Sequence, residues 1–326
     1  MVKGSTTNSL MKHIRDNHNI SINGSRQKTN LINMGYYHGY KGYRFIKDVT
    51  NKPPYNDFEE ITVVYKFDMK IKSLFYPHIM FIETAIKNRI LETLVGYGNM
   101  DLETVFNKHL TSYQQYQSSD NRYHKAMKSR LQLREKIYSA VSYNYTNKEP
   151  VIQHFYHSNK PLPLWAIFEV ISLGYLGNFY KCLNNQIKTE VNKRMKTLGT
   201  RVNQDGNELS NIIFLLKDLR NSVAHNSIIF DCRFKKANIN ISVTRYIEEM
   251  TGVLNVRFNH ITDYFVLLAF LLKQLGVDKS EIQQLIKDLK VSADNLYQKV
   301  PHQAYAQIMG SDFRTKIYSL EQFIRN

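Results

Sequence analysis

The feature that most restricts how this chain can fold is a long apolar repeat between residues 58 and 95. Apolar residues there mostly recur every three or four positions, as they do along one buried face of an α-helix. The repeat predicts one long helix or two that abut, and Gly96 and Gly98 favour an end directly after it. Similar repeats predict helices over residues 164–183, within 207–230, and over 261–276 and 280–289. We therefore expect an all-α, mainly helical fold.

The remaining segments are more polar and divide the chain. Residues 21–28 are typical of a loop, residues 31–45 favour a compact turn or short hairpin, and residues 238–244 (NINISVT) favour a short strand or a loop. Residues 99–160 are basic and tyrosine-rich, which predicts short helices and a mobile insert that faces RNA. We expect an N-terminal extension at 1–57, a helical domain at 58–290 that carries this insert, and a C-terminal helical tail at 291–326.

The composition excludes several classes of protein. Hydrophobic residues make up 43% of the chain, so it is not a disordered tail protein. Two cysteines, Cys182 and Cys232, cannot form a disulfide framework or a four-cysteine zinc site. Neither a metal-site spacing nor a glycine-rich phosphate loop occurs, so we expect no metal and no cofactor. The longest apolar run is too short for a membrane span, and we expect a soluble, cytoplasmic protein without a membrane partner.

The net charge of +16 indicates a polyanionic partner, because lysine and arginine neutralise phosphates. The 22 tyrosines favour RNA in particular, since tyrosine stacks on unpaired bases. The predicted RNA-binding residues are Lys125, Lys128, Arg130, Arg134, Lys193, Arg194, Lys235, Lys236 and Tyr37. Two alternatives remain open: the basic residues form a solvated surface, and the tyrosines around Tyr37 pack against a neighbouring helix.

The string DLRNSVAHN, residues 218–226, carries the candidate catalytic residues. Asn221 and His225 are four positions apart and share one helical face. Arg220 and His225 are about 140° apart around an ideal helix, so they reach one pocket only because arginine is long or because the helix ends near His225. An alternative is that Arg220 pairs with an acid such as Asp218 or Glu208, while His225 caps the helix end.

Arginine, asparagine and histidine together suit a metal-independent cleavage of RNA. Histidine can take the proton of the substrate 2′-hydroxyl or give one to the leaving oxygen, because its pKa lies near neutral pH. Arginine can stabilise the charge on the phosphorane, and asparagine can orient the histidine or the phosphate. The motif supplies one histidine, so a scheme with two histidines predicts a second copy of the chain, most simply as a C₂ homodimer.

LRNSVAHN resembles the Arg-Asn-x-x-x-His form of the HEPN ribonuclease motif. Three further blocks precede it along the chain: LINMGYYHGYKGYRF, YKFDMKIKSLFYPHIMFIETAIKNRI and LWAIFEVISLGYLGNFY. In this order the blocks resemble the Abi family of bacterial abortive-infection proteins, in particular the AbiD/AbiF-like group. The resemblance implies a HEPN-like helical core, RNase activity in phage defence and an active site that is often dimeric. For AbiF-like members it also implies a small noncoding RNA that can bind and restrain the protein.

The resemblance also assigns roles to single residues. Arg220 and His225 match the arginine and histidine of the motif, and Asn221 matches its polar neighbour. Glu83 matches the acid of the block at residues 82–89, where it would orient Arg220 or His225, and Lys87 or Arg89 would touch RNA. A structural ion pair is equally compatible. We thus expect a metal-independent endoribonuclease that is restrained by a small RNA, with a non-catalytic RNA-binding protein of the same fold as the alternative.

Overall fold

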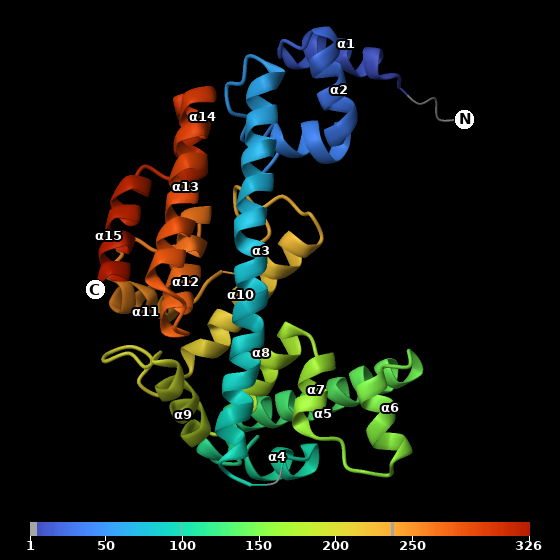
Figure 1. Ribbon diagram of the computed structural model, residues 1–326, viewed down its shortest axis with the longest axis vertical. Coiled ribbons are helices and arrows are strands. Elements are labelled where there is room, and N and C mark those ends of the chain that lie inside the picture. The colour runs from blue at the N-terminus through green and yellow to red at the C-terminus, as the bar shows by residue number, and fades with distance from the viewer. Residues whose placement is uncertain (1–4, 99, 236–237) are drawn as a thin grey trace.

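The computed structural model describes residues 5–98, 100–235 and 238–326 of the chain (Figure 1). Within these residues the fold is all-α without a β-strand, which confirms the predicted class. The helices are α1 (Thr7–His18), α2 (Gly24–Met34), the π-helix η1 (Gly35–Lys41), α3 (Phe58–Val95), α4 (Leu102–Lys108), the 3₁₀-helix η2 (Ser112–Gln115), α5 (Asn121–Thr146), α6 (Pro150–His157), α7 (Leu164–Val170), α8 (Leu173–Cys182), α9 (Asn185–Met195), α10 (Glu208–Ala224), α11 (Ile241–Thr251), α12 (Ile261–Gln274), α13 (Lys279–Lys299), α14 (His302–Met309) and α15 (Phe313–Arg325).

The long apolar repeat forms the single helix α3, whose 38 residues correspond to a length of about 57 Å. A capping box fixes its start, because Asp57 accepts a hydrogen bond from the Glu59 amide while Glu60 accepts one from the Asp57 amide. Gly96 caps the other end, as predicted. Helix α3 runs along the long axis of the molecule, with α1 and α2 near one end and α4–α8 toward the other (Figure 1).

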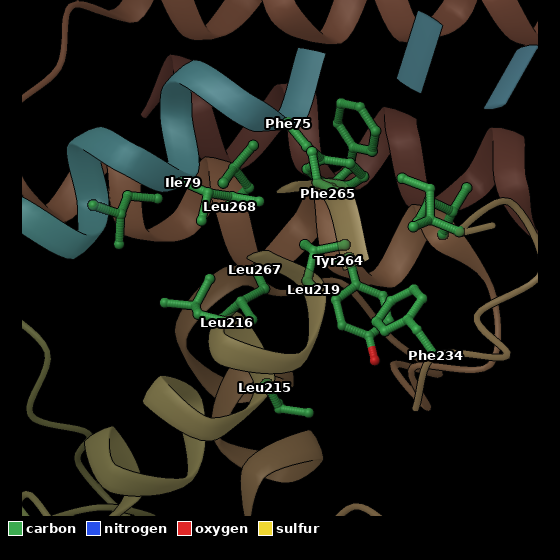
Figure 2. Packing of buried hydrophobic residues seen from close by; sticks show 14 of the residues in the cluster. Phe75, Ile79, Leu215, Leu216, Leu219, Phe234, Tyr264, Phe265, Leu267 and Leu268 are labelled. Atoms are coloured by element: carbon green, nitrogen blue, oxygen red, sulfur yellow. The ribbon is translucent and has the colours of Figure 1, made fainter. Parts of the chain in front are cut away.

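The core lies where α3 meets α10 and α12, and α13 packs on α3 beside them. The Phe75 and Phe265 rings of α3 and α12 are 4.4 Å apart between centroids. Leu216 and Leu219 of α10 extend the same cluster (Figure 2). Helix α10 thus presents one face to the core and leaves the other for solvent and neighbouring side chains. No helix in the described part of the chain combines the length and apolarity that a bilayer crossing requires.

The N-terminal segment is more helical than we predicted. Residues 21–28 were expected to form a loop, but α2 begins at Gly24. Residues 31–45 were expected to form a turn or hairpin, but they continue α2 into the π-helix η1. Gly39 permits this winding, because a Cβ there would lie 2.5 Å from the carbonyl oxygen of Met34. Of the tyrosines in this segment, Tyr40 is buried while Tyr37 is 79% exposed.

Two further predictions are corrected downstream. The apolar segment at residues 164–183 was expected to form one helix but forms two, and the break falls at Ser172, which caps α8. Gly177 lies inside α8 and lets α10 approach closely, because a Cβ there would lie 3.0 Å from the Phe214 ring. The expected strand or loop at residues 238–244 instead contains the start of α11, whose first turn is capped by the Asn240 side chain.

The predicted insert and tail also have regular structure. The segment at residues 99–160 contains α5, a helix of 26 residues, as well as the expected short helices. Helix α13 continues to Lys299, so it passes through the expected boundary at residue 290 and is longer than the predicted helix at 280–289.

Candidate functional site

The polar residues of α10 lie on the face that does not enter the core. Asn211, Asp218 and His225 are seven positions apart in turn, and Asn207 and Asn221 follow the same spacing. Seven residues are close to two helical turns, so these side chains form one stripe along the helix. The stripe lines three neighbouring clefts, which together follow α10 from its beginning to its end.

The end of α10 positions His225. The Asn226 amide donates to the Val223 carbonyl at 3.2 Å, and the Ser227 amide donates to the Ser222 carbonyl at 2.8 Å. Asn226 has a φ of 52° and adopts the left-handed conformation that ends the helix in a Schellman motif. His225 is therefore the capping residue, as one of the alternatives predicted, and its side chain is exposed in a cleft.

A buried network fastens this helix end to α3. The Lys72 ammonium donates to the Asn226 side-chain oxygen at 2.9 Å and lies 2.7 Å from an Asp68 carboxylate oxygen. Asp68 is fully buried and also accepts hydrogen bonds from the Tyr43 hydroxyl and from the amides of residues 229 and 230. Burial, followed by the adjacent Asp68 carboxylate, raises the pKa of Tyr43. The hydroxyl consequently stays protonated and donates to Asp68.

A second buried carboxylate holds the loop beyond the helix. Asp231 accepts a hydrogen bond from the Lys47 amide at 2.5 Å and hydrogen bonds from the Arg233 guanidinium at 2.6–2.9 Å. The same guanidinium donates to the Phe45 carbonyl at 2.9 Å. The chain around Phe45 is thereby joined to the loop that follows α10, although the two segments are distant in sequence.

These contacts shape an open cleft of about 560 Å³ at the end of α10. Asn221 and His225 of the predicted site both line it. His38, from the π-helix η1, lines the same cleft. No spacing in the sequence links His38 to His225. The complete lining is His38, Asp218, Asn221, Ser222, His225, Ser227, Ile228, Arg233 and Phe234.

Arg220 is not among the residues that line this cleft. Its Nε lies 3.4 Å from Glu83 Oε2 on α3, and its Nη1 donates to the Asn221 side-chain oxygen at 3.3 Å. Lys87 lies 3.3 Å from the other Glu83 oxygen. Glu83 thus contacts Arg220 and not His225, and Asn221 connects the guanidinium to the edge of the cleft. Arg220 remains 35% exposed.

The predicted RNA-binding residues have varied surroundings. Arg130 donates to the carbonyls of Phe106 and Leu110, and its guanidinium lies 3.7 Å from the centre of the Phe106 ring. Arg134 pairs with Glu103 at 2.7 Å. Lys125 lines a separate basic cleft, whereas Lys128, Lys193 and Tyr37 are exposed. Arg194 and Arg89 both contact Glu92, and Lys235 donates to Asn259. Lys236 lies outside the described residues.

One of three comparisons with known proteins finds a match. A family model described as Abi-like protein matches residues 29–231, which include η1, α3, α10 and most of the residues that line the cleft. A search of curated proteins and of solved structures finds no match to the chain.

Proposed function

Because this chain belongs to the Abi-like protein family, we propose that it acts in phage defence as an endoribonuclease that cuts RNA without a metal ion. Membership of the family suggests a role in abortive infection. The nuclease activity is the finer part of the proposal, and the cleft at the end of α10 supports it.

The observation that carries the proposal is that His225, Asn221 and His38 line one open cleft. In the proposed reaction, one histidine removes the proton of the RNA 2′-hydroxyl, and the resulting oxygen attacks the adjacent phosphorus. The bond from phosphorus to the 5′-oxygen breaks as the other histidine donates a proton to that oxygen. The products are a 2′,3′-cyclic phosphate and a 5′-hydroxyl. DNA has no 2′-hydroxyl and does not react by this route.

Arg220 and Glu83 have supporting roles in this proposal. The Arg220 guanidinium donates a hydrogen bond to Asn221, which lines the cleft. A rotation of the long Arg220 side chain brings the guanidinium toward a bound phosphate. There it stabilises the charge that develops on the phosphorane. Glu83 acts as a positioning residue, because it contacts Arg220 and not the cleft.

The decisive experiment compares cleavage of a single-stranded RNA by the parent protein and by an Arg220→Ala/His225→Ala variant. We expect the parent to cut in the presence of a chelator, to leave 2′,3′-cyclic phosphate ends, and to spare a substrate with one 2′-deoxy position at the cleavage site. We expect the variant to lose the activity. His124→Ala is the matched control, because His124 is an exposed histidine on α5 outside the cleft. A double variant that cuts as well as the parent refutes the proposal.

The proposal includes RNA as the partner that keeps the enzyme inactive in the cytoplasm. A small noncoding RNA would suit the net charge of +16. We further propose a homodimer, in which a second copy of the cleft adds its own histidines. Sequencing of RNA that copurifies with the protein, and light scattering of the eluted species, test these two points separately.

A non-catalytic RNA-binding protein is the second candidate. The position of Arg220 favours it, because the guanidinium lies against Glu83 and does not line the cleft with His225. This candidate predicts that RNA binding persists in the Arg220→Ala/His225→Ala variant and falls with salt, and that the parent protein leaves the RNA intact. Growth arrest on expression that His225→Ala abolishes would favour the enzyme.

A further inference from the structure

A second cleft lies at the opposite end of α10 from His225. It has a volume of about 380 Å³ and is lined by residues of η2, α5, α8, α9 and the start of α10. Arg122, Lys125, Lys181 and Lys188 line it, together with neutral polar residues and Tyr116. None of the described lining residues is acidic. The cleft therefore concentrates positive charge in a space that is large enough for a small ligand.

Lys188 is the most unusual of these cations, because it is only 3% exposed. Its ammonium group donates to the Asn207 side-chain oxygen at 2.9 Å. Within the described parts of the chain, no carboxylate lies within ion-pair distance of it. Burial lowers the pKa of Lys188 to about 8. At neutral pH the group is still mostly protonated, so the cleft contains a buried cation that no described carboxylate contacts directly, although Asp205 attracts it from beyond ion-pair distance.

The other buried lysines provide an internal comparison. Lys72 is paired with Asp68 at 2.7 Å, and Lys316 is paired with Asp263 at 2.6 Å. Each of these two ammonium groups has the carboxylate that a buried charge requires. Lys188 has an amide oxygen in its place, and the residue lines a cleft that opens to solvent.

The rim adds further positive charge. Lys125 on α5 and Lys181 on α8 are exposed, and neither takes part in an ion pair between described residues. Arg122 pairs with Asp120 at 2.7 Å, and its guanidinium lies 5.0 Å from the centre of the Tyr116 ring. The aromatic ring offers a surface on which a base can stack.

We infer that this cleft binds a phosphate group carried by a nucleotide, with the Lys188 ammonium at its base and Lys125 and Lys181 at its rim. The phosphate supplies the counter-ion that Lys188 lacks, and the base of the nucleotide contacts Tyr116. This inference rests on charge and burial at this cleft alone, so it does not depend on the proposed nuclease activity.

Two sources of the phosphate are chemically equivalent at this site: a free nucleotide and the backbone of an RNA. A third cleft along α10 connects the two clefts already described. It shares Asn211 with the cleft that Lys188 lines and Asp218 with the cleft that His225 lines. Fourteen positions of α10 separate Asn211 from His225, which corresponds to about 21 Å. An RNA strand along this face reaches both ends of the helix, whereas a mononucleotide occupies one.

The test measures binding of AMP by calorimetry and of a short labelled single-stranded RNA by fluorescence anisotropy. The protein carries His225→Ala throughout, so that the RNA stays intact. We expect Lys188→Met, and separately Lys125→Met/Lys181→Met, to weaken binding at least about tenfold, as the loss of charge-assisted hydrogen bonds requires. Lys128→Met is the matched control, because Lys128 is exposed on α5 and does not line the cleft.

Each outcome decides the inference. Weakened binding of both AMP and RNA supports a site for any nucleotide phosphate, and weakened binding of RNA alone supports the RNA backbone as its source. Equal binding by the cleft variants and the parent overturns the inference. An equal loss in the Lys128→Met control also overturns it, because the effect would then reflect net charge and not this cleft. Since Lys125 and Lys181 are exposed, their double variant remains informative if Lys188→Met fails to fold.

Discussion

The substitution Lys188→Met is expected to stabilise the ligand-free protein. The pKa of Lys188 is about 8 in the folded chain and has an ordinary value of 10.5, because burial disfavours the charged form. The lowered pKa means that the buried charge reduces the unfolding free energy of the parent by about 3 kcal/mol at neutral pH. Removal of the ammonium also removes its hydrogen bond to Asn207, which contributes about 1 kcal/mol. The variant should therefore be more stable than the parent by about 2 kcal/mol.

The difference in unfolding free energy between Lys188→Met and the parent should depend on pH, and this dependence identifies its cause. Between the folded and the ordinary pKa, the unfolded chain binds more protons at Lys188 than the folded chain does. The unfolding free energy of the parent therefore rises with pH in that window, while the variant lacks this contribution. The difference between the two proteins should shrink by about 1 kcal/mol from about pH 7 to about pH 9.

Urea denaturation of both proteins at the two pH values measures this difference, and all other titrating groups cancel between them. Lys128→Met serves as the control, since an exposed lysine should change the unfolding free energy by less than about 0.5 kcal/mol. A Lys188→Met protein that is less stable than the parent at neutral pH, with a gap that does not depend on pH, refutes the reasoning. Lys188 would then be a well-compensated structural residue.

Three further predictions concern the His225 cleft and its supports. Asp68→Asn should lower the unfolding free energy by about 3 kcal/mol in thermal denaturation, because Lys72 then loses its buried carboxylate partner; an unchanged melting temperature would contradict this. If His38 donates the proton to the leaving 5′-oxygen, His38→Ala should slow the cleavage of normal RNA. The variant should still cleave a substrate with sulfur at the leaving 5′-position at the parent rate, because a thiolate leaves without a proton. Slow cleavage of both substrates would argue for a structural role of His38. Gly177→Val should cost about 2 kcal/mol in urea denaturation, because its side chain would overlap the Phe214 ring, and a neutral effect would mean that α8 and α10 can separate.

Much of the helical framework could be predicted from apolar periodicity. Helices α3 and α10 each bury one continuous face, so the spacing of their apolar residues matches the period of a helix. Helix α12 is buried on all sides along most of its length, and its sequence is correspondingly apolar throughout. The prediction failed where a local signal opposed the packing. In residues 238–244, alternating Ile239, Ile241 and Val243 resembled a strand, but Asn240 caps a helix that then buries Val243 and Tyr246. At residues 164–183 the apolar repeat predicted one helix, although Ser172 caps the start of a second helix there.

The candidate site was predictable only in its local part. Asn221 and His225 share a helical face by their spacing alone, and they do line one cleft. The position of His38 depends on the packing of η1 near the end of α10, which no local pattern encodes. Asp68 left a weaker signal, because it is an acid within the apolar repeat of α3 and precedes Lys72 by one helical turn. The acid predicted to orient the motif, Glu83, contacts Arg220 and not His225.

Lys188 could not be separated from other basic residues by sequence, because composition does not distinguish a buried cation from an exposed one. Its burial nevertheless links stability to ligand binding. A ligand that binds the parent more tightly than Lys188→Met stabilises the parent more, and the difference at saturation equals the difference in binding free energy. Without a ligand, the variant is expected to be more stable than the parent by about 2 kcal/mol. Each tenfold loss of affinity in the variant should reduce this difference in unfolding free energy by about 1.4 kcal/mol when ligand is saturating. Denaturation of both proteins with saturating RNA measures this directly. A gap that is the same with and without RNA would mean that the ligand does not contact the Lys188 ammonium, even if it binds elsewhere on the protein.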